Sequence, residues 1–510
     1  MSSSTEYREL EESLRPTANT KLFYSISTVI DTSEFREIVA HRLSAAVKIP
    51  TVVGDGMGHV EEDPQWEVFY EFSEFLRNTF PTIYKHLDYT IINEHGHIFT
   101  WEGSDPSLKP LLMMAHSDVV PVSVSSTDTW TYAPFSGHYD GKYIWGRGSE
   151  DDKSNLVTIL STIELLLNGS FNPSRTIIVA IGFDEEGGAE KSFGAQCIAE
   201  VLLQRYGKDG IELIFDEGVA GLETKSGVEF AFPATSEKGY MDVTVRINTP
   251  GGHSQDPPKH TGIGYLAQAI QIIEENPLPP VVSVDNLAFA YLQKAALHCN
   301  EPADVFRCDI EHKTSTGELM YMTEPSEIRT TTAVTVVHGG DKVNSLPESA
   351  YALVNHRIAP HDSVQVVKDH YLSILMPWAK KHKLSVYAFG KNLSQSCDVH
   401  AALVLTSDYD LDPSPITDSN DQRFKLLADT IRGVFGDNVV VTPTLLLGNT
   451  DTRYYWDLSN QIYRMSPWRA NHDPRGTRMH TVDERMPIAG LMEMVRFYHT
   501  FILNVDEYRS

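Results

Sequence analysis

Apolar residues recur along the first part of the chain at the spacing of amphipathic helices. The segment "SEFREIVAHRLSAAVKIP" (33–50) keeps this spacing until Pro50, and "WEVFYEFSEFLRNTF" (66–80) carries an aromatic stripe. A helix with this period buries one face, so we interpret the stripe as core rather than as a ligand site. The residues before this point are mostly polar, and we expect 1–34 to form an N-terminal extension.

Short apolar runs alternate with helical patterns farther along the chain. Strands are predicted for "PLLMMAHSDVV", "RTIIVAIGF" and "IELIFDEG", and helices for "NLVTILSTIELLLNG" and "GAQCIAEVLLQRYG". This alternation is typical of an α/β domain with a largely parallel or mixed sheet. We expect 35–237 to form the first part of that domain.

The pattern changes near residue 238. "YMDVTVRINTP" alternates like a half-exposed strand, and the helix "GIGYLAQAIQIIEEN", two further strands, the helix 364–382 and a last strand, "LSVYAF", follow it. This order predicts an antiparallel sheet covered by helices, over residues 238–405. The long segment 277–327 has no assigned structure. From 406 to 510 the α/β pattern resumes, so the second domain is inserted into the first.

The bulk composition excludes several classes of partner. A chain of 510 residues exceeds the size of one core, so two or more domains are expected. The formal net charge of −27 argues against nucleic acid and anionic membrane surfaces. We find no apolar run long enough to span a membrane and no apolar signal core. On these features we expect a soluble, cytoplasmic chain.

Four cysteines occur, and none forms a CxxC pair, which excludes a zinc-ribbon or thioredoxin interpretation. Cys299 and Cys308 are close enough in sequence to pair in an oxidising compartment. Four cysteines in so long a chain fit reduced, buried thiols equally well.

Acids and histidines follow several of the predicted strands. Asp184, Glu185 and Glu186 are adjacent, and three neighbouring carboxylates require positive charge nearby. His116 and Asp118 lie two residues apart after another strand, so they face the same way in an extended chain. Asp118 can then fix the tautomer of His116 while the second ring nitrogen binds a metal.

Further candidate ligands occur at the other element ends. They are Asp151 and Asp152 before a helix, Asp216 and Glu217 after a strand, and His480 near the C-terminus. Side chains at the carboxyl ends of strands in one α/β domain converge on the crevice that binds ligands. Imidazole and carboxylate without thiolate suit zinc or a similar divalent metal, and one aspartate could bridge two ions. Glu186 would then be a ligand, and Glu185 would move the proton.

The order of short motifs resembles the di-zinc metallopeptidases that include aminoacylase and carboxypeptidase S. The motifs are "AHSDVVPV", "WGRGSEDDKS", "GFDEEGG", "FDEG", "TPGGHS", "GNTDTRYYW" and "HTVDE", and they span nearly the whole chain from about residue 35. Segments 101–122 and 130–149 look closest to the fungal carboxypeptidase S branch. The resemblance implies an α/β catalytic domain with a mixed sheet, interrupted by an α+β, ferredoxin-like lid. It also implies two Zn²⁺ per chain, with Co²⁺ or Mn²⁺ as alternatives, and a vacuolar or secreted location.

The resemblance assigns roles to residues of the catalytic domain. The implied metal ligands are His116, Asp151, Glu186, Asp216 and His480, with Asp151 as the bridge and Glu217 as the alternative to Asp216. Asp118 is the partner that orients His116, and Glu185 is the general base. The bond between Asp151 and Asp152 looks like the family's cis peptide.

Other roles fall on the lid and the pocket wall. His253 matches a lid histidine that stabilises the tetrahedral oxyanion and that comes from the other subunit in dimeric relatives. Asn344 and Arg357 match groups that hold the substrate carboxylate, and Asp451 and Arg453 are expected to line the same pocket. The planar fork of arginine suits bidentate binding of a carboxylate.

Two features depart from the family pattern. Glu150 adds a negative charge beside the bridging aspartate, and no partner for it is evident. The segment 277–327 is longer than in simple aminoacylases, so it could form the acyl pocket or replace dimer contacts. A homodimer and a monomer both stay open.

Together these features predict a hydrolase for the amide bond next to a C-terminal amino acid with a free carboxylate. The substrate would be a small molecule or short peptide, either a Gly-X dipeptide or an N-acyl amino acid. A di-zinc aminopeptidase is the first alternative, and it would require a free α-amine. A non-catalytic metal-dependent binder is the second alternative, although such a protein would be expected to lack Glu185.

Overall fold

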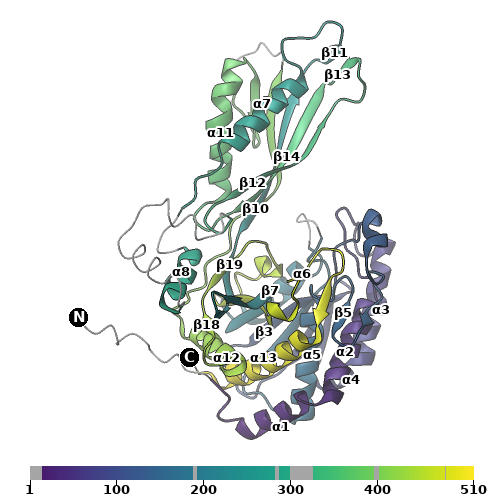
Figure 1. Ribbon diagram of the computed structural model, residues 1–510, viewed down its shortest axis with the longest axis vertical. Helices are drawn as coiled ribbons and strands as arrows, with labels where there is room; N and C mark the ends of the chain where they lie inside the picture. The colour runs from purple at the N-terminus through teal and green to yellow at the C-terminus, as the bar shows by residue number, and fades with distance from the viewer. Residues whose placement is uncertain are drawn as a thin grey trace, which may run out of the picture.

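The computed structural model describes residues 14–187, 192–281, 286–298, 326–394, 401–476 and 478–509. An α/β catalytic domain forms the base, and an α+β lid domain stands on it (Figure 1). The predicted fold class is therefore confirmed. Cys299, Cys308 and Cys397 lie outside the described residues, whereas Cys197 is a free thiol.

The catalytic domain is built on a ten-stranded mixed sheet with the main strand order β1-β2-β6-β3-β7-β20-β9-β19. The central strands β6, β3, β7 and β20 are parallel, and β1, β2 and β6 pair antiparallel. The strands are β1 (Asp88–Ile92), β2 (Gly96–Trp101), β3 (Leu111–His116), β6 (Ile177–Gly182), β7 (Leu213–Lys225), β8 (Val228–Ala231), β9 (Ala234–Glu237), β18 (Val440–Val441), β19 (Thr444–Leu446) and β20 (Ile462–Arg469).

Helices cover both faces of this sheet because side chains alternate along the strands. In β3, Leu111 and Met113 join the larger core, whereas Leu112 and Met114 join a second core beneath α6 (Ala195–Tyr206). The larger core is covered by α1 (Thr20–Ile30), α2 (Ser33–Val47), α3 (Glu67–Thr79), α4 (Pro81–His86), α5 (Lys153–Asn168), α12 (Gln422–Phe435) and α13 (Ile488–Glu507). The predicted extension thus contributes a packed helix, α1, which the polar composition concealed.

A three-stranded sheet lies beside the metal-type residues. It has the order β21-β5-β4, with β4 (His138–Tyr139), β5 (Tyr143–Trp145) and β21 (Arg485–Pro487). Short 3₁₀ turns complete the domain, namely η1 (Pro64–Trp66), η2 (Val124–Thr129), η3 (Asp451–Tyr454) and η4 (Ala470–His472).

The lid sheet has the order β12-β14-β10-β17-β15-β16, and α7 and α11 pack on it. Its elements are β10 (Gly239–Asn248), α7 (Gly262–Glu275), β12 (Thr331–Gly339), β14 (Ser349–Ile358), α11 (Val364–Lys381), β15 (Ser385–Ala388), β16 (Lys391–Asn392) and β17 (Ala402–Leu411). The sequence interpretation missed β17, which pairs with β10 in the middle of the sheet. The predicted boundary at 405 therefore falls inside a lid strand.

Two chain segments connect the domains, and they are bonded to each other. The Ser414 backbone N–H donates to the Glu237 carbonyl at 3.1 Å, and the Glu237 backbone N–H donates to Ser414 Oγ at 2.7 Å. At the outer end of the lid, β11 (Gly252–His253) pairs with β13 (Ser345–Leu346). Within 277–327, α8 (Leu287–His298) packs on the catalytic domain, with Tyr291 against Phe230. No helix in the described ranges is long and apolar enough to cross a membrane.

Candidate active site

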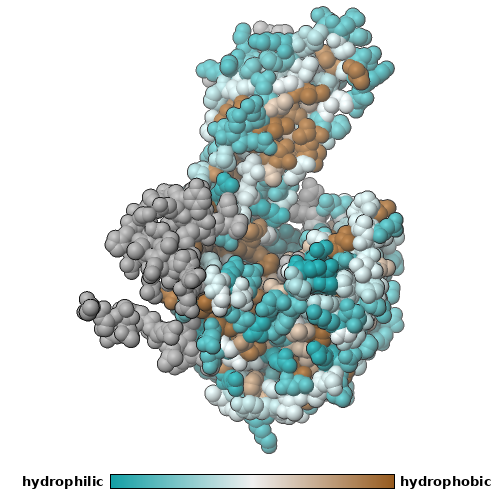
Figure 2. Space-filling view, in the orientation of Figure 1, coloured by the Kyte–Doolittle hydropathy of each residue, from teal (hydrophilic) through white to brown (hydrophobic). Residues whose placement is uncertain are grey.

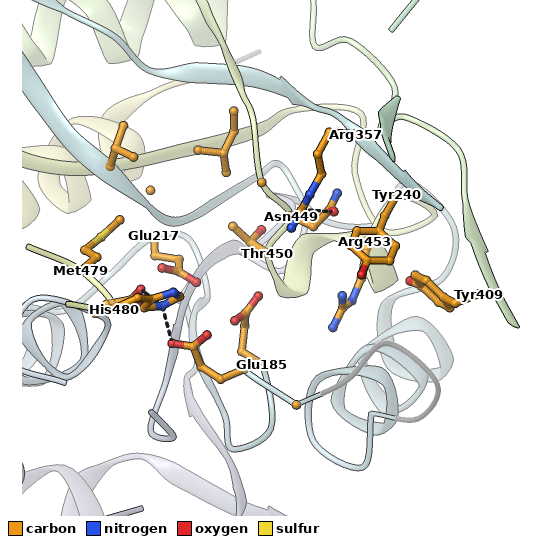
Figure 3. Close-up of a pocket in the computed structure, with 17 residues that line it drawn as sticks. Glu185, Glu217, Tyr240, Arg357, Tyr409, Asn449, Thr450, Arg453, Met479 and His480 are labelled. Carbon is orange, nitrogen blue, oxygen red and sulfur yellow. Dashed lines mark hydrogen bonds and ion pairs between the residues drawn. The ribbon is translucent and has the colours of Figure 1, made fainter. Parts of the chain in front are cut away.

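A pocket of about 430 Å³ opens where the lid meets the carboxyl ends of the central parallel strands. Acids and a histidine line one part of it, and two arginines with two tyrosines line another (Figure 3). This is the crevice in which α/β sheets bind ligands. The pocket therefore brings six of the twelve predicted site residues together, with Glu217 beside them.

His116 ends β3 with its ring fully buried and oriented by Asp118. The ring Nδ1 lies 3.2 Å from Asp118 Oδ1, and the other Asp118 oxygen accepts from the Glu186 backbone N–H at 2.9 Å. Asp118 thus orients one candidate ligand and anchors the chain at another. The Nε2 atom of His116 is left to face the carboxylates.

Asp151 lies between the two histidines. Its Oδ1 is 3.2 Å from His116 Nε2, and its Oδ2 is 3.0 Å from His480 Nε2. Burial opposes ionisation of Asp151, but the two imidazoles outweigh it and lower the pKa of its carboxyl. One oxygen toward each imidazole is the arrangement of a carboxylate that bridges two metal ions.

The spacing of these atoms fits tetrahedral coordination. With bonds of 2.0–2.1 Å to zinc, two ligand atoms at a tetrahedral centre lie about 3.3 Å apart. His116 Nε2 lies 3.2 Å from Asp151 and 3.3 Å from Glu217 Oε1, and His480 Nε2 lies 2.9 Å from Glu186 Oε1. The side chains are therefore spaced as ligands, in two groups that share Asp151.

Glu217, and not Asp216, faces this cluster, which corrects the choice of Asp216. Successive side chains of a strand point to opposite faces, and Asp216 is directed toward Thr450 and Arg464. Burial raises the pKa of Asp216 to about 6. The sequence left both Asp216 and Glu217 open at "FDEG". Because side chains alternate along β7, only Glu217 of these two faces the cluster.

Asp152 and Asp184 lie near the cluster but have structural partners. Asp152 accepts from the His116 backbone N–H at 3.1 Å and from the Asn155 amide, and the peptide bond before it is cis, as the resemblance implied. Asp184 accepts from Ser192 Oγ and from the Gly194 N–H, both at 3.0 Å. Asp184 therefore shapes the loop that carries Glu185 and Glu186.

Glu185 and Glu186 differ in their surroundings. Glu186 pairs with His480, whereas a Glu185 oxygen lies within 4.8 Å of the ligand atoms of His116 and Glu186. Burial raises the pKa of Glu185 well above its ordinary value. Hydrogen bonds that His480 donates to the carboxylates of Asp151 and Glu186 raise its pKa to about 10, which reflects a strongly negative local potential. Such a potential attracts cations.

The opposite part of the pocket is cationic and aromatic. Arg357 Nη1 donates to Asn449 Oδ1 at 3.3 Å, and its guanidinium lies over the Tyr240 ring, 4.8 Å from the centroid. Arg453 lies over Tyr454, and its Nε has no hydrogen-bond partner in the described part of the chain. In Figure 3 both guanidinium groups lie on the side of Glu185 that is opposite His480.

Among the pocket residues that sequence reasoning missed are Tyr240, Tyr409, Asn449 and Met479. Asn449 and Met479 lie inside or beside motifs that were recognised, so each could have been found there. Tyr409 belongs to the missed strand β17, and Tyr240 is the second residue of the first lid strand, β10. Neither tyrosine carries a signal that separates it from an ordinary strand residue.

Besides the buried His116, Asp118 and Asp216, three further predicted residues do not line the described pocket. His253 and Asn344 are exposed at the outer end of the lid, beside the β11–β13 pair (Figure 1). Asp451 is buried behind the wall, where a Cβ on Gly182 would lie 2.4 Å from its Oδ2. Asp451 therefore supports the wall, and the roles assigned to His253 and Asn344 stay predictions.

Comparison with known proteins agrees with this site. The model of peptidase family M20/M25/M40 matches residues 112–504. Carboxypeptidase S of Saccharomyces cerevisiae (strain ATCC 204508 / S288c) is 39% identical over 95% of this chain and 87% of the yeast protein. N-fatty-acyl-amino acid synthase/hydrolase PM20D1 of Mus musculus is 32% identical over 94% of this chain and 90% of the mouse protein.

A solved structure supports the fold. The M20 family metallo-carboxypeptidase Sso-CP2 from Sulfolobus solfataricus is 15% identical and has a TM-score of 0.63, with 92% of this chain and 99% of that chain covered. The resemblance found in the sequence is thus confirmed, and with it a metal-dependent hydrolase of the carboxypeptidase and amidohydrolase class. The chain belongs to peptidase family M20/M25/M40.

Proposed function

We propose that this protein hydrolyses the amide bond of N-acyl amino acids and short N-blocked peptides that end in a free carboxylate. One observation carries the proposal: Arg357 and Arg453 share a pocket with the acidic cluster. Neither guanidinium forms an ion pair with a carboxylate of the described residues. Two unpaired arginines beside Glu185 suit a substrate that brings its own anion.

The proposed cofactor is a pair of zinc ions. His116, Asp151 and Glu217 would hold one ion, and Asp151, Glu186 and His480 would hold the other. The nitrogen and oxygen donors, their spacing and the absence of thiolate suit zinc, with Co²⁺ or Mn²⁺ as alternatives. When bound, such a pair polarises a carbonyl and lowers the pKa of water to about 7.

The protein's own groups would move the proton and hold the substrate. Glu185 would take a proton from the attacking water and pass it to the leaving amine nitrogen. Burial raises the pKa of Glu185, which favours its taking up that proton. Arg357 and Arg453 would bind the carboxylate of the leaving amino acid, so that the scissile carbonyl lies beside Glu185.

The acyl side of the pocket favours a blocked over a free amine. Val219, Leu446 and Met479 supply apolar surface there, and Met479 lies beside His480 in Figure 3. The carboxylates among the described lining residues belong to the metal cluster or to Glu185, which leaves none to bind an α-amine. This argues against the aminopeptidase alternative. An apolar acyl group also agrees with the name of the mouse relative, an N-fatty-acyl-amino acid synthase/hydrolase.

We further propose that a second copy of the chain completes the site. His253, in β11, and Asn344, next to β13, are exposed, and these two strands lie at the outer end of the lid, far from the pocket residues of the catalytic domain. The lid also has an exposed edge strand, β12, on which Val336 is 43% and Val337 is 61% exposed. Figure 2 shows apolar residues gathered on the lid. Unpaired strand edges with exposed apolar residues favour association, so the proposed assembly is a homodimer. The vacuolar or secreted location stays a prediction.

The proposed function is tested with purified protein and a matched substrate set. The set contains an N-acyl amino acid, its C-terminal amide, a Gly-X dipeptide and the N-blocked form of that dipeptide, each assayed with and without a chelator. We expect turnover of the N-acyl amino acid and the N-blocked dipeptide, a much higher KM for the amide, and loss of activity with the chelator. Turnover that requires a free α-amine would instead establish the aminopeptidase.

A further inference from the structure

Two buried acids beside the metal cluster have no place in the function proposed above. Glu484 is fully buried and Glu150 is 5% exposed, yet neither lines the pocket. A buried carboxylate is unfavourable unless hydrogen bonds or cations compensate it. The contacts of these two acids therefore indicate what they do.

Glu484 reaches the loop that carries the bridging aspartate. Its Oε1 accepts from the Glu150 backbone N–H at 3.0 Å and, more weakly, from that of Asp151 at 3.4 Å. Its Oε2 accepts from Arg147 Nη1 at 2.5 Å. The Glu484 carbonyl also accepts from the Gly146 N–H at 2.9 Å, at the end of the β5–β21 ladder. One side chain thus binds this loop at three places.

Glu150, which lies on the loop of Asp151, contacts the turn that carries His480. Its Oε2 accepts from the Arg478 backbone N–H at 2.9 Å, two residues before His480. This is the partner that the sequence did not reveal. Its other oxygen has no hydrogen bond to the described residues, so the contact with the Arg478 backbone is the main one that holds it.

The turn that carries His480 needs external support. His480 and Asp483 have φ of 60° and 63°, in the left-handed region that residues with a Cβ seldom adopt. Inside the turn, Thr481 N–H donates to the Arg478 carbonyl at 3.1 Å. Glu150 fixes one end of this turn at Arg478, and Glu484 lies at the other end.

We propose that Glu150 and Glu484 are positioning residues. They hold the Asp151 loop and the His480 turn at the spacing at which Asp151 and His480 can bind the same metal ion. The inference rests on the proposed two-metal function. The metal held by His116 and Glu217 shares only Asp151 with these segments, because its other two ligands lie on strands β3 and β7, which these acids do not touch. Loss of either acid should therefore weaken the metal held by Asp151, Glu186 and His480 more than the metal held by His116 and Glu217.

The test is a zinc titration of purified, refolding-competent protein by equilibrium dialysis at buffered free zinc, with bound metal counted by elemental analysis. Glu150→Met, which removes the carboxylate acceptor, and Glu484→Gln are compared with Glu164→Gln, a buried acid that pairs with Arg42 and lies on neither loop. We expect the first two variants to bind the zinc at His480 about 10- to 100-fold more weakly, with a smaller loss at the other zinc. Glu164→Gln should titrate like the unmodified chain.

A double variant separates positioning from general destabilisation. In a His480→Ala chain the second site has already lost its ligand, so adding Glu150→Met should change zinc binding no further. Unchanged affinity for the second zinc in both single variants, or equal weakening of both zincs, would overturn the inference. If Glu484→Gln does not fold, Glu150→Met decides the question, because it loses only one backbone contact. An unmodified chain that binds fewer than two zincs would overturn the proposed two-metal function itself.

Discussion

Oε1 of Glu217 lies 3.3 Å from Nε2 of His116, which brings together strands β7 and β3 of the parallel sheet. The adjacent acid, Asp216, points to the other face of β7. Both acids are buried beside the same strand end, so burial alone does not distinguish the two candidate ligands. The distance to His116 favours Glu217.

We predict that Glu217→Ala removes one zinc, whereas Asp216→Asn keeps both. Glu217 would supply one of only three protein ligands to its ion, and a carboxylate contributes directly to affinity. Asp216→Asn is the matched control, since it removes a charge at the adjacent position without touching the cluster. Elemental analysis after dialysis measures the metal per chain. If Asp216→Asn loses zinc and Glu217→Ala does not, Asp216 is the ligand, as the sequence analysis first assigned it.

A second prediction concerns the general base. Glu185→Ala should retain both zincs and lower kcat by at least about 10², the usual size of acid–base catalysis. The reason is that Glu185 lies near the ligand atoms but is not paired with either histidine. Glu186→Ala is the comparison, and it should lose zinc as well as activity. Near-normal turnover by Glu185→Ala would show that another group moves the proton.

The parts of the site that could be predicted from sequence are those with a local signature. His116 and Asp118 are two residues apart at a strand end, so their common direction follows from the period of a strand. At "FDEG" the same period allows either Asp216 or Glu217 to face the site, because a shift of one residue exchanges the two faces of a strand. Only the pairing of β7 with β3 and β20 shows which of the two acids faces the cluster.

A third prediction tests carboxylate capture. Arg357→Ala should raise KM at least tenfold for an N-acyl amino acid and leave its poorly bound amide unaffected, since a buried charged hydrogen bond contributes about 1.5–3 kcal/mol. Arg246→Ala is a matched control, because this lid arginine also lies 4.8 Å over a tyrosine ring, that of Tyr351. Steady-state kinetics with both substrates measure the effect. An equal rise in KM for acid and amide would argue against capture by Arg357.

A fourth prediction tests the homodimer by mixing inactive variants. Glu185→Ala and His253→Ala are each expected to be inactive. If His253 serves the partner's pocket, one site of each mixed dimer regains both groups, and random exchange restores about a quarter of normal activity. The activity of the two variants mixed under conditions that prevent subunit exchange gives the baseline. No recovery in a mixture shown to contain mixed dimers would place His253 in its own pocket or outside the reaction.

Long-range features of the fold were the hardest to predict. Strand β17 is half-exposed and ends in the polar run "TSDYD", so its pattern did not separate it from a loop, although it pairs with β10 along almost its whole length. Helix α1 was hidden in the same way, because a mainly polar segment has only Ile26 and Ile30 as fully buried residues. In both elements tertiary pairing outweighs a weak local pattern.

The last prediction concerns stability in acid. His499 is buried in α13 with its ring stacked on Phe23, and burial lowers the pKa of its imidazole to about 4, against about 6.5 in an unfolded chain. Between these values the unfolded state binds the extra proton, so this residue stabilises the fold above pH 6.5 and loses that contribution as the pH falls to 4. The loss amounts to roughly 3 kcal/mol. Replacing His499 with Phe, which can stack on Phe23 but cannot titrate, should remove this dependence. Urea unfolding at pH 7.5, 6, 5 and 4 should therefore show the unmodified chain losing more stability on acidification than His499→Phe. Parallel pH profiles for the two proteins would mean that His499 already carries its proton in the folded state.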